Sequence, residues 1–350
     1  MVGCRRSAEV DGDVLRMKIM IDTIHLVYGT DDNYIFPTMV SAASAAWLLG
    51  NGRKMVVHLF DAGVTDEHYA DYERKVCALN SNVSCQRHRL GSEMFKDFGA
   101  WRGSVVTYSR MFMAEILPDL DWAIYFDGDT LWTGDIGKLW DLRDESKLVQ
   151  ASIDPPTPTG FVNPEWQWYK ERGIAINPDG YLCMGLMLAN LKKMREERVP
   201  QKCREFMAKH PAPRVVDQTV LNYVCEGKKA PLPPEWGVFS AWHGTANLTK
   251  EGAIHYVTDV PWRRDKINRL LSDVVLLWYE FGKRVMHEDW LPRYISPWGR
   301  CWRRWVFVVL KYNQWLLSLH PYLKGHLRNT HGVRGCERKV ILSRFGEGTR

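Results

Sequence analysis

The sequence predicts an α/β protein with a mostly parallel central sheet flanked by helices. First, short apolar runs alternate with longer segments of helical periodicity over residues 22–257. Second, 45% of the 350 residues are hydrophobic and 25% are charged, as in globular proteins that bury one large core or two modest ones. Third, no apolar run approaches the roughly 20 residues of a membrane-spanning helix, so a span is not expected.

The length and period of each apolar segment give the individual elements. Strands are predicted at residues 23–28, 55–60, 122–126, 148–153, 182–188 and 253–257. Helices are predicted at residues 36–49, 65–80, 108–117, 191–210 and 217–225. Residues 154–179 contain five prolines and are predicted to form a long ordered loop or lid, which inside a compact domain is usually functional. No repeat, dinucleotide fingerprint or P-loop is found.

The N-terminal residues and the cysteines indicate the cellular compartment of the protein. Residues 1–20 mix Arg5, Arg6 and Arg16 with acidic residues and lack the apolar stretch of a signal peptide, so we expect a loose leader. The eight cysteines contain no C-x-x-C pair, which argues against a zinc site. Reduced thiols in a cytoplasmic protein are the expectation.

The C-terminal region, residues 266–350, differs in charge from the rest of the chain. Residues 283–350 carry 14 basic and 4 acidic side chains, whereas the other residues carry 33 and 37. Residues 283–350 also hold five tryptophans, and residues 301–320 have apolar side chains at helical spacing. A basic, aromatic helix suits an anionic membrane surface, which would make the protein peripheral on the inner face of a membrane. A helix packed on the body with a solvated basic edge explains the pattern equally well. Nucleic acid is not an expected partner, because no recognised binding motif accompanies the charge.

The most informative segment is the buried strand at residues 122–126, which runs directly into Asp127, Gly128 and Asp129. In extended chain the two carboxylates point to the same side and can meet at one centre, where Mg²⁺ or Mn²⁺ is the natural occupant. His255, at another predicted strand, could add a nitrogen ligand. An Asp-Gly-Asp turn and a satisfied core histidine are the alternatives.

A series of motifs occurs in order over residues 21–262. They are Thr30-Asp31-Asp32-Asn33-Tyr34, Tyr108-Ser109-Arg110, Tyr125-Phe126-Asp127-Gly128-Asp129-Thr130, Gly134-Asp135 before Leu139-Trp140, Gly185-Leu186-Met187-Leu188-Ala189-Asn190-Leu191, Asp217-Gln218-Thr219-Val220-Leu221-Asn222, and His255-Tyr256 before Pro261-Trp262. In these motifs the chain resembles the retaining glycosyltransferases of family 8, which include glycogenin and bacterial lipopolysaccharide galactosyl- and glucosyltransferases.

The resemblance implies a GT-A nucleotide-diphosphate-sugar transferase fold over residues 21–265 and a donor diphosphate held by Mn²⁺ or Mg²⁺. By position, Asp127, Asp129 and His255 resemble the metal ligands. The residues that resemble donor-binding positions are Thr30, Asp31, Asp32, Asn33, Arg110, Asp127, Gly128, Asp129, Cys183, Gly185 and Thr258. Among them, Asp31 and Asn33 resemble contacts to the uridine and ribose.

The resemblance also places the catalytic residues. Gln218, Asp217 and Asp154 are the predicted ones, and Arg110, Asp127, Asp217 and Gln218 resemble the residues that hold the donor sugar. An amide oxygen is a poor nucleophile, so Gln218 is a better electrostatic support for a cationic sugar. We therefore favour attack of the acceptor on the face from which UDP departs, with the UDP phosphate helping to take the acceptor proton, over a covalent intermediate.

Three departures from the family pattern bear on specificity. Cys183 stands where the family commonly has an asparagine that touches the donor sugar, so the identity of the hexose does not carry over. The segment of residues 256–262 is one residue short and lacks the diphosphate lysine, for which Arg263 or Arg264 could substitute. Gly237 stands where asparagine is frequent.

The functional prediction is a metal-dependent, retaining transferase that moves a hexose, galactose or glucose, from a UDP-sugar to a hydroxyl of a glycan or glycolipid. The alternatives are a sugar-nucleotide hydrolase or nucleotidyltransferase, and a non-catalytic UDP-sugar-binding protein. The intact acidic pair, His255 and Gln218 favour an active enzyme over the binding protein, whereas the missing lysine favours the reverse.

Overall fold

The computed structural model describes residues 22–96, 98, 104–154, 164–175, 180–210, 216–239, 248–257, 260–263, 273–294, 296–298, 301 and 335–346. The predicted leader, Thr258 and residues 302–320 of the predicted C-terminal helix lie outside these ranges.

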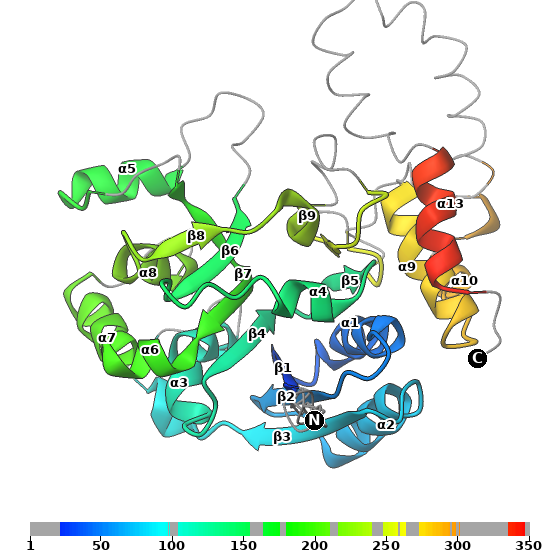
Figure 1. The fold of residues 1–350 in the computed structure, drawn as a ribbon, viewed down its shortest axis with the longest axis horizontal. Helices are drawn as coiled ribbons and strands as arrows, with labels where there is room; N and C mark the ends of the chain where they lie inside the picture. Colours follow the sequence, from blue (N-terminus) through cyan, green and yellow to red (C-terminus); the bar gives the residue numbers. More distant parts are fainter. Residues whose placement is uncertain are drawn as a thin grey trace, which may run out of the picture.

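A seven-stranded sheet forms the centre of the molecule, in the order β3-β2-β1-β4-β7-β6-β8 (Figure 1). Its strands are β1 (Ile24–Thr30), β2 (Met55–Asp61), β3 (Val83–Arg89), β4 (Trp122–Phe126), β6 (Val149–Ile153), β7 (Leu182–Asn190) and β8 (Lys229–Pro231). Only β7 runs against its neighbours β4 and β6, so the predicted mostly parallel sheet is confirmed. A smaller sheet joins β5 (Thr130–Trp132), β10 (Ala253–His255) and β9 (Val238–Phe239).

Helices cover both faces of the large sheet. The α-helices are α1 (Ile35–Leu48), α2 (Asp66–Cys77), α3 (Met113–Ile116), α4 (Ile136–Trp140), α5 (Pro164–Glu171), α6 (Leu191–Glu196), α7 (Val199–Lys209), α8 (Val216–Val224), α9 (Asp273–Arg284), α10 (Leu291–Tyr294) and α13 (Gly335–Arg344). Short 3₁₀ helices are η1 (Ser92–Phe95), η2 (Val106–Phe112) and η4 (Pro234–Gly237). Along β4, Ile124 belongs to the core beneath α1 and α9, and Tyr125 belongs to the core beneath η2 and α8. The alternation of side chains along each strand thus builds two cores.

Three predicted elements differ from the structure. The helix predicted at residues 108–117 is mostly the 3₁₀ helix η2, followed by the short α3. The helix predicted at residues 191–210 is divided into α6 and α7 at Arg198, whose φ of 57° lies in the left-handed region, and Pro200 lies in the first turn of the new helix. The predicted loop 154–179 contains α5, because Pro164 suits a first helical turn and the residues after it tolerate a helix.

The described part of the C-terminal region packs on the body. Helices α9, α10 and α13 lie beside α1 (Figure 1), and Trp278, Trp290 and Phe345 belong to the core that also contains the α1 side chains. Trp298, by contrast, is 83% exposed. No described helix combines the length and the apolar character needed to cross a membrane.

Candidate active site

The predicted site residues gather where β1 and β4 end and β7 begins, with β10 alongside. Asp127 and Asp129 follow β4, and main-chain hydrogen bonds fix both: Asp127 N donates to Gly185 O at 2.8 Å, and Tyr256 N donates to Asp129 O at 2.8 Å. The acidic turn is therefore held from β7 on one side and from the end of β10 on the other. This edge of a mainly parallel sheet is the usual position for ligands in α/β proteins.

Asp127, Asp129 and His255 form a group that fits a cation. Each offers one ligand atom, and the three atoms lie within 4.8 Å of one another. Nε2 of His255 is 3.0 Å from Asp129 Oδ1 and 3.8 Å from Asp127 Oδ2. A Cβ at Gly185 would lie 2.1 Å from Asp127 Oδ2, so only glycine leaves the carboxylate in this place. Carboxylate oxygens with one imidazole are a donor set that suits Mn²⁺ or Mg²⁺.

The charges of this group also fit a cation. Burial raises the pKa of Asp127 to about 6, a rise that Arg110 opposes and the neighbouring Asp129 reinforces. Burial alone would raise the pKa of Asp129 as well, but His255 holds it below its usual range. Likewise, burial opposes charge on His255, yet Asp129 raises the pKa of this histidine well above its usual value. The proton on His255 therefore compensates part of the negative charge of the two carboxylates. A bound divalent cation would take over this role.

Arg110 connects this group to helix α8. The guanidinium, only 7% exposed, has Nη2 2.6 Å from Asp127 Oδ1 and Nε 3.0 Å from Asp217 Oδ2. The arginine also lies over the ring of Tyr125, 4.6 Å from its centroid. Thr107 Oγ1 donates to Asp217 Oδ1 at 2.7 Å, which fixes the second carboxylate. Two carboxylates from different elements thus determine the orientation of one buried cation.

Gln218 is held between β7 and Asp154. Its Oε1 accepts a hydrogen bond from Met184 N at 3.3 Å, and its Nε2 donates to Asp154 Oδ2 at 3.1 Å. The amide is 9% exposed, and its orientation follows from these two partners. Cys183 is buried beside Met184, and burial raises the pKa of its thiol, so the thiol stays protonated at neutral pH.

The turn after β1 holds the remaining donor-binding candidates. Asp31 Oδ1 accepts from Asn33 N at 3.1 Å and from Tyr34 N at 3.2 Å, which closes the turn that begins α1. Asn33 is exposed beside it. Tyr34 OH donates to Asp129 Oδ2 at 3.4 Å, so the turn reaches the acidic pair.

Two positions in the same area depend on a close fit around Thr38. Thr38 Oγ1 donates to the buried Thr30 Oγ1 at 3.2 Å. A Cβ at Gly128 would lie 2.2 Å from Thr38 Oγ1. The central glycine of Asp127-Gly128-Asp129 is therefore required by the packing of α1.

The structure brings most of the predicted residues that it describes into one network and adds others, whereas Asp32 bonds Thr65 and His68 and Thr258 lies outside the described residues. From the β1–α1 turn the contacts run through Asp129, His255, Asp127 and Arg110 to α8 and Asp154. Tyr34, Thr107 and Tyr125 belong to this network without having been predicted, although Tyr34 and Tyr125 stand inside the family motifs. Tyr34 ends the Asp-Asp-Asn-Tyr turn, which is the signal that could have identified it.

A separate cavity of about 820 Å³ opens at the opposite edge of the sheet. Asp22 and His25 at the start of β1, Trp122 at the start of β4 and Lys192 after β7 belong to its lining, and none of the site residues does. The cavity is therefore not part of the candidate active site.

Comparison with known proteins identifies the family. Residues 25–266 match the family model of glycosyl transferase family 8. This chain belongs to glycosyl transferase family 8. It is similar to a putative glycosyltransferase of Haemophilus influenzae, with 30% identity over 126 residues, which are 36% of this chain and 36% of the relative. It is also similar to the lipopolysaccharide 1,3-galactosyltransferase of Salmonella typhimurium, with 27% identity over 216 residues, which are 57% of this chain and 59% of the relative.

Solved structures of glycosyltransferases share the fold. A crystal structure of the galactosyltransferase LgtC in complex with donor and acceptor sugar analogues has a TM-score of 0.57 and 24% identity, over 69% of this chain and 91% of that chain. The apo structure of the bifunctional glycosyltransferase WbbM has a TM-score of 0.59 and 20% identity, over 71% of this chain and 48% of that chain. The match with the two curated relatives spans about a third and three-fifths of their lengths. The predicted family and fold class are confirmed.

Proposed function

We propose that this protein moves a hexose, galactose or glucose, from a UDP-sugar to a hydroxyl of a glycan or glycolipid, with retention of anomeric configuration. One observation carries the proposal: Asp127 faces His255 with one carboxylate oxygen and Arg110 with the other. A diphosphate held by a cation at the first oxygen and a sugar oriented by the arginine at the second would meet at this residue. Membership of family 8 supports the same reaction class.

The donor would lie along the network from the β1–α1 turn to α8. Asp31 and Asn33 would hold the uridine and ribose at the turn that also contains Thr30 and Asp32, and Asp127, Asp129 and His255 would hold Mn²⁺ or Mg²⁺. When bound, the cation supplies positive charge that stabilises the departing UDP without a protein acid. Thr258 and a basic residue after it would complete the phosphate contacts, although Thr258 lies outside the described residues.

The sugar end of the site depends on Arg110, Asp217 and Gln218. Arg110 is fixed by two carboxylates, so it can hold the hydroxyls of a hexose in one orientation without moving. The amide oxygen of Gln218 would support positive charge on the anomeric carbon. Asp154 orients that amide from the side of the 154–179 segment, where we place the acceptor. This arrangement suits attack on the face that UDP leaves.

Composition and one relative support the choice of acceptor. The basic residues of the region 283–350 suit an anionic membrane surface, and a lipopolysaccharide galactosyltransferase is among the similar proteins. A glycolipid at the inner face of a membrane is therefore the acceptor that we propose.

The test uses the purified full chain with Mn²⁺ and a panel of UDP-sugars, with UDP release measured by a coupled assay. We expect one donor to be turned over, and we expect Asp129→Ala to reduce this turnover at least about 100-fold because a cation ligand is lost. Asp119→Ala is the matched control, since this exposed carboxylate lines the cavity at the opposite edge of the sheet.

The products separate the remaining functions. Transfer of labelled sugar to a membrane-extract glycolipid supports the proposal, and release of free sugar alone points to a hydrolase. A protein that binds UDP-sugars but turns none over would be the non-catalytic binding protein. Either of the last two results contradicts the proposed reaction.

A further inference from the structure

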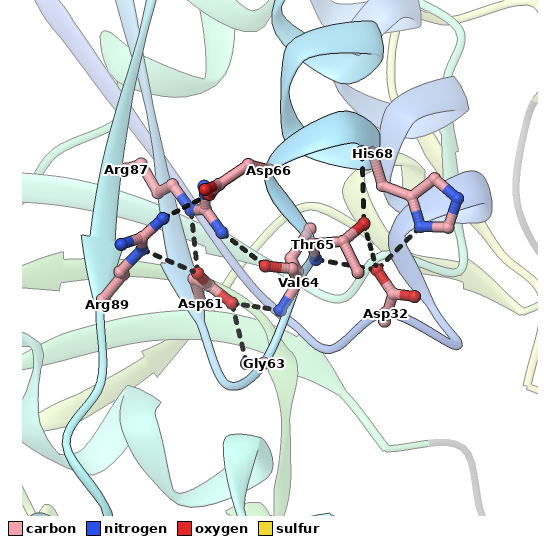
Figure 2. Close-up of polar contacts among 9 residues, drawn as sticks. All are labelled: Asp32, Asp61, Gly63, Val64, Thr65, Asp66, His68, Arg87 and Arg89. Carbon is pink, nitrogen blue, oxygen red and sulfur yellow. Dashed lines mark hydrogen bonds and ion pairs between the residues drawn. The ribbon is translucent and has the colours of Figure 1, made fainter.

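A second polar network lies beside the β1–α1 turn (Figure 2). Asp32 Oδ1 accepts hydrogen bonds from Thr65 N at 2.9 Å, from Thr65 Oγ1 at 3.2 Å and from His68 Nδ1 at 2.7 Å. Thr65 is also the N-cap of α2, where its Oγ1 accepts from His68 N at 3.3 Å. The carboxylate of Asp32 therefore joins the turn after β1 to the start of α2.

The start of α2 is itself anchored to the sheet. Asp61 is 3% exposed, and its Oδ1 accepts from Gly63 N at 2.8 Å and from Val64 N at 2.5 Å. Its Oδ2 accepts from Arg87 Nε at 2.8 Å, and the same arginine bonds the Val64 carbonyl and Asp66 (Figure 2). Gly63 adopts a φ of 115°, which only glycine adopts readily. The β2–α2 turn is thus a rigid support held by β3.

Among the described residues, few other hydrogen bonds hold the β1–α1 turn on the side of α2. Its internal hydrogen bonds, from Asn33 N and Tyr34 N to Asp31 Oδ1, set its shape but not its position relative to the sheet. A main-chain bond from Ala62 N to Thr30 O at 3.0 Å holds only the last residue of β1. The Tyr34 hydroxyl fixes the other end of the turn to Asp129, so on the side of α2 the position of Asp31 and Asn33 depends on the contacts of Asp32 with Thr65 and His68.

We propose that Thr65 and His68 are positioning residues for donor binding, which fix the Asp31–Asn33 turn by holding Asp32. They touch no donor atom in this scheme, and they act through the turn on affinity for the nucleotide part of the donor. The proposal rests on the proposed function, because it assigns the turn to the uridine and ribose.

The Asp32–His68 contact gives the effect a pH dependence. The hydrogen bond and the charge of Asp32 raise the pKa of His68, and Glu67 and Asp71 on α2 act in the same direction. When folding raises the pKa of a group, that group stabilises the folded protein fully at pH values below its pKa in the unfolded chain. This stabilisation is lost as the pH rises through its pKa in the folded protein. The hold on Asp32 should therefore be strongest in mild acid and weaken in alkaline solution.

The experiment measures KM and kcat for the preferred UDP-sugar at about pH 6 and about pH 9. His68→Ala should raise the donor KM roughly 3- to 10-fold at the lower pH, with kcat within about 2-fold of the wild type, because ground-state positioning is lost. At the higher pH the variant and the wild type should differ less. His68→Gln retains a donor without a titrating charge, so it should recover part of the affinity and remove the pH dependence. Thr65→Val should raise KM in the same way at both pH values.

Arg74→Ala is the matched control, since it breaks an exposed ion pair with Asp71 on the same helix without contact to Asp32. It should leave KM unchanged. Amide hydrogen exchange of Asn33 and Tyr34 is the second readout, and it should accelerate in His68→Ala but not in the control.

Each outcome has one meaning. A raised KM with faster exchange in the turn supports the proposal. If the wild type turns over a donor and His68→Ala and Thr65→Val leave its KM unchanged, the positioning role is wrong while the proposed function stands. An equal fall of kcat in His68→Ala and Arg74→Ala also contradicts it, because the effect would then be a general loss of structure. If the wild type turns over no donor, the proposed function itself is wrong, and this inference fails with it.

Discussion

A row of three histidines across β1, β2 and β3 should make the protein sensitive to acid. His58 on β2 is 3% exposed, and its ring lies between His25 and His88, with nitrogen separations of 3.0 Å on each side. Burial lowers the pKa of His58 to about 3, and the adjacent His25 and His88 act in the same direction. The folded protein therefore keeps this ring neutral where the unfolded chain protonates it.

The size of the effect follows from that difference. Folding lowers the pKa of His58, so its neutral ring stabilises the folded protein fully above the unfolded-chain pKa of about 6.5. This stabilisation is lost as the pH falls toward the folded-state pKa of about 3. Each pH unit in this window costs about 1.4 kcal/mol. Between about pH 7 and pH 5, protonation of His58 in the unfolded chain should reduce the free energy of unfolding by about 2 kcal/mol.

The assay is urea unfolding followed by tryptophan fluorescence at several pH values. In His58→Gln, the amide can still donate to one neighbour and accept from the other, but it does not titrate in this range. At pH 7 the free energy of unfolding of the variant should be roughly 1 to 2 kcal/mol lower than that of the wild type. Between pH 7 and pH 5, however, the variant should lose about 2 kcal/mol less of this free energy than the wild type loses. His287→Asn, at an exposed histidine with a φ of 57° that asparagine tolerates, is the control and should keep the wild-type slope. Equal slopes in wild type and His58→Gln would refute the reasoning.

Three further substitutions test the site and its support. Gly185→Ala places a methyl group where Asp127 Oδ2 now lies, so kcat/KM for the donor should fall roughly 100-fold while the melting temperature changes little; an active variant would mean that Asp127 is not held as described. Arg110→Lys keeps the charge but cannot reach two carboxylates in one plane, and we expect a loss of roughly 100-fold in kcat/KM, with full activity as the contrary result. Trp290→Ala removes a fully buried ring and should lower the free energy of unfolding by about 3 to 5 kcal/mol in urea titrations, whereas a change below about 1 kcal/mol would show that the C-terminal packing contributes little.

An element could be predicted where its own sequence indicates which of its residues are buried. The bounds of β4 agree with the prediction at both ends, because five consecutive residues are buried on both faces and the run stops at a carboxylate. The edge strand β3 was missed, since its sequence VSCQRHR has no apolar period and its strand state comes from pairing with β2. The division between α6 and α7 was missed for a similar reason, because the left-handed backbone at Arg198 leaves no mark on the apolar spacing.

The candidate site was predictable to the extent that it depends on spacing. The i, i+2 relation alone brings Asp127 and Asp129 to one centre, and the family motifs add His255 and Arg110. The link from Arg110 to Asp217 could not be derived from spacing, because it requires η2 and α8 to pack together over one face of the sheet. The contacts of Asp32 with Thr65 and His68 could not be derived from spacing either, because these two residues lie 33 and 36 positions after Asp32 in the sequence.

The C-terminal helices are connected to the acidic pair through a row of aromatic rings. Tyr34, whose hydroxyl bonds Asp129, meets Trp262 edge to face with centroids 5.8 Å apart. Trp262 lies 5.7 Å from Trp278 on α9, and Trp278 lies 4.7 Å from Trp290. Close-packed rings of this kind transmit displacement, because the interior has no space into which one ring can move alone. The aromatic residues at this end of the chain therefore pack in one row with the tyrosine that bonds a predicted cation ligand, and membrane attachment is not needed to explain Trp278 and Trp290.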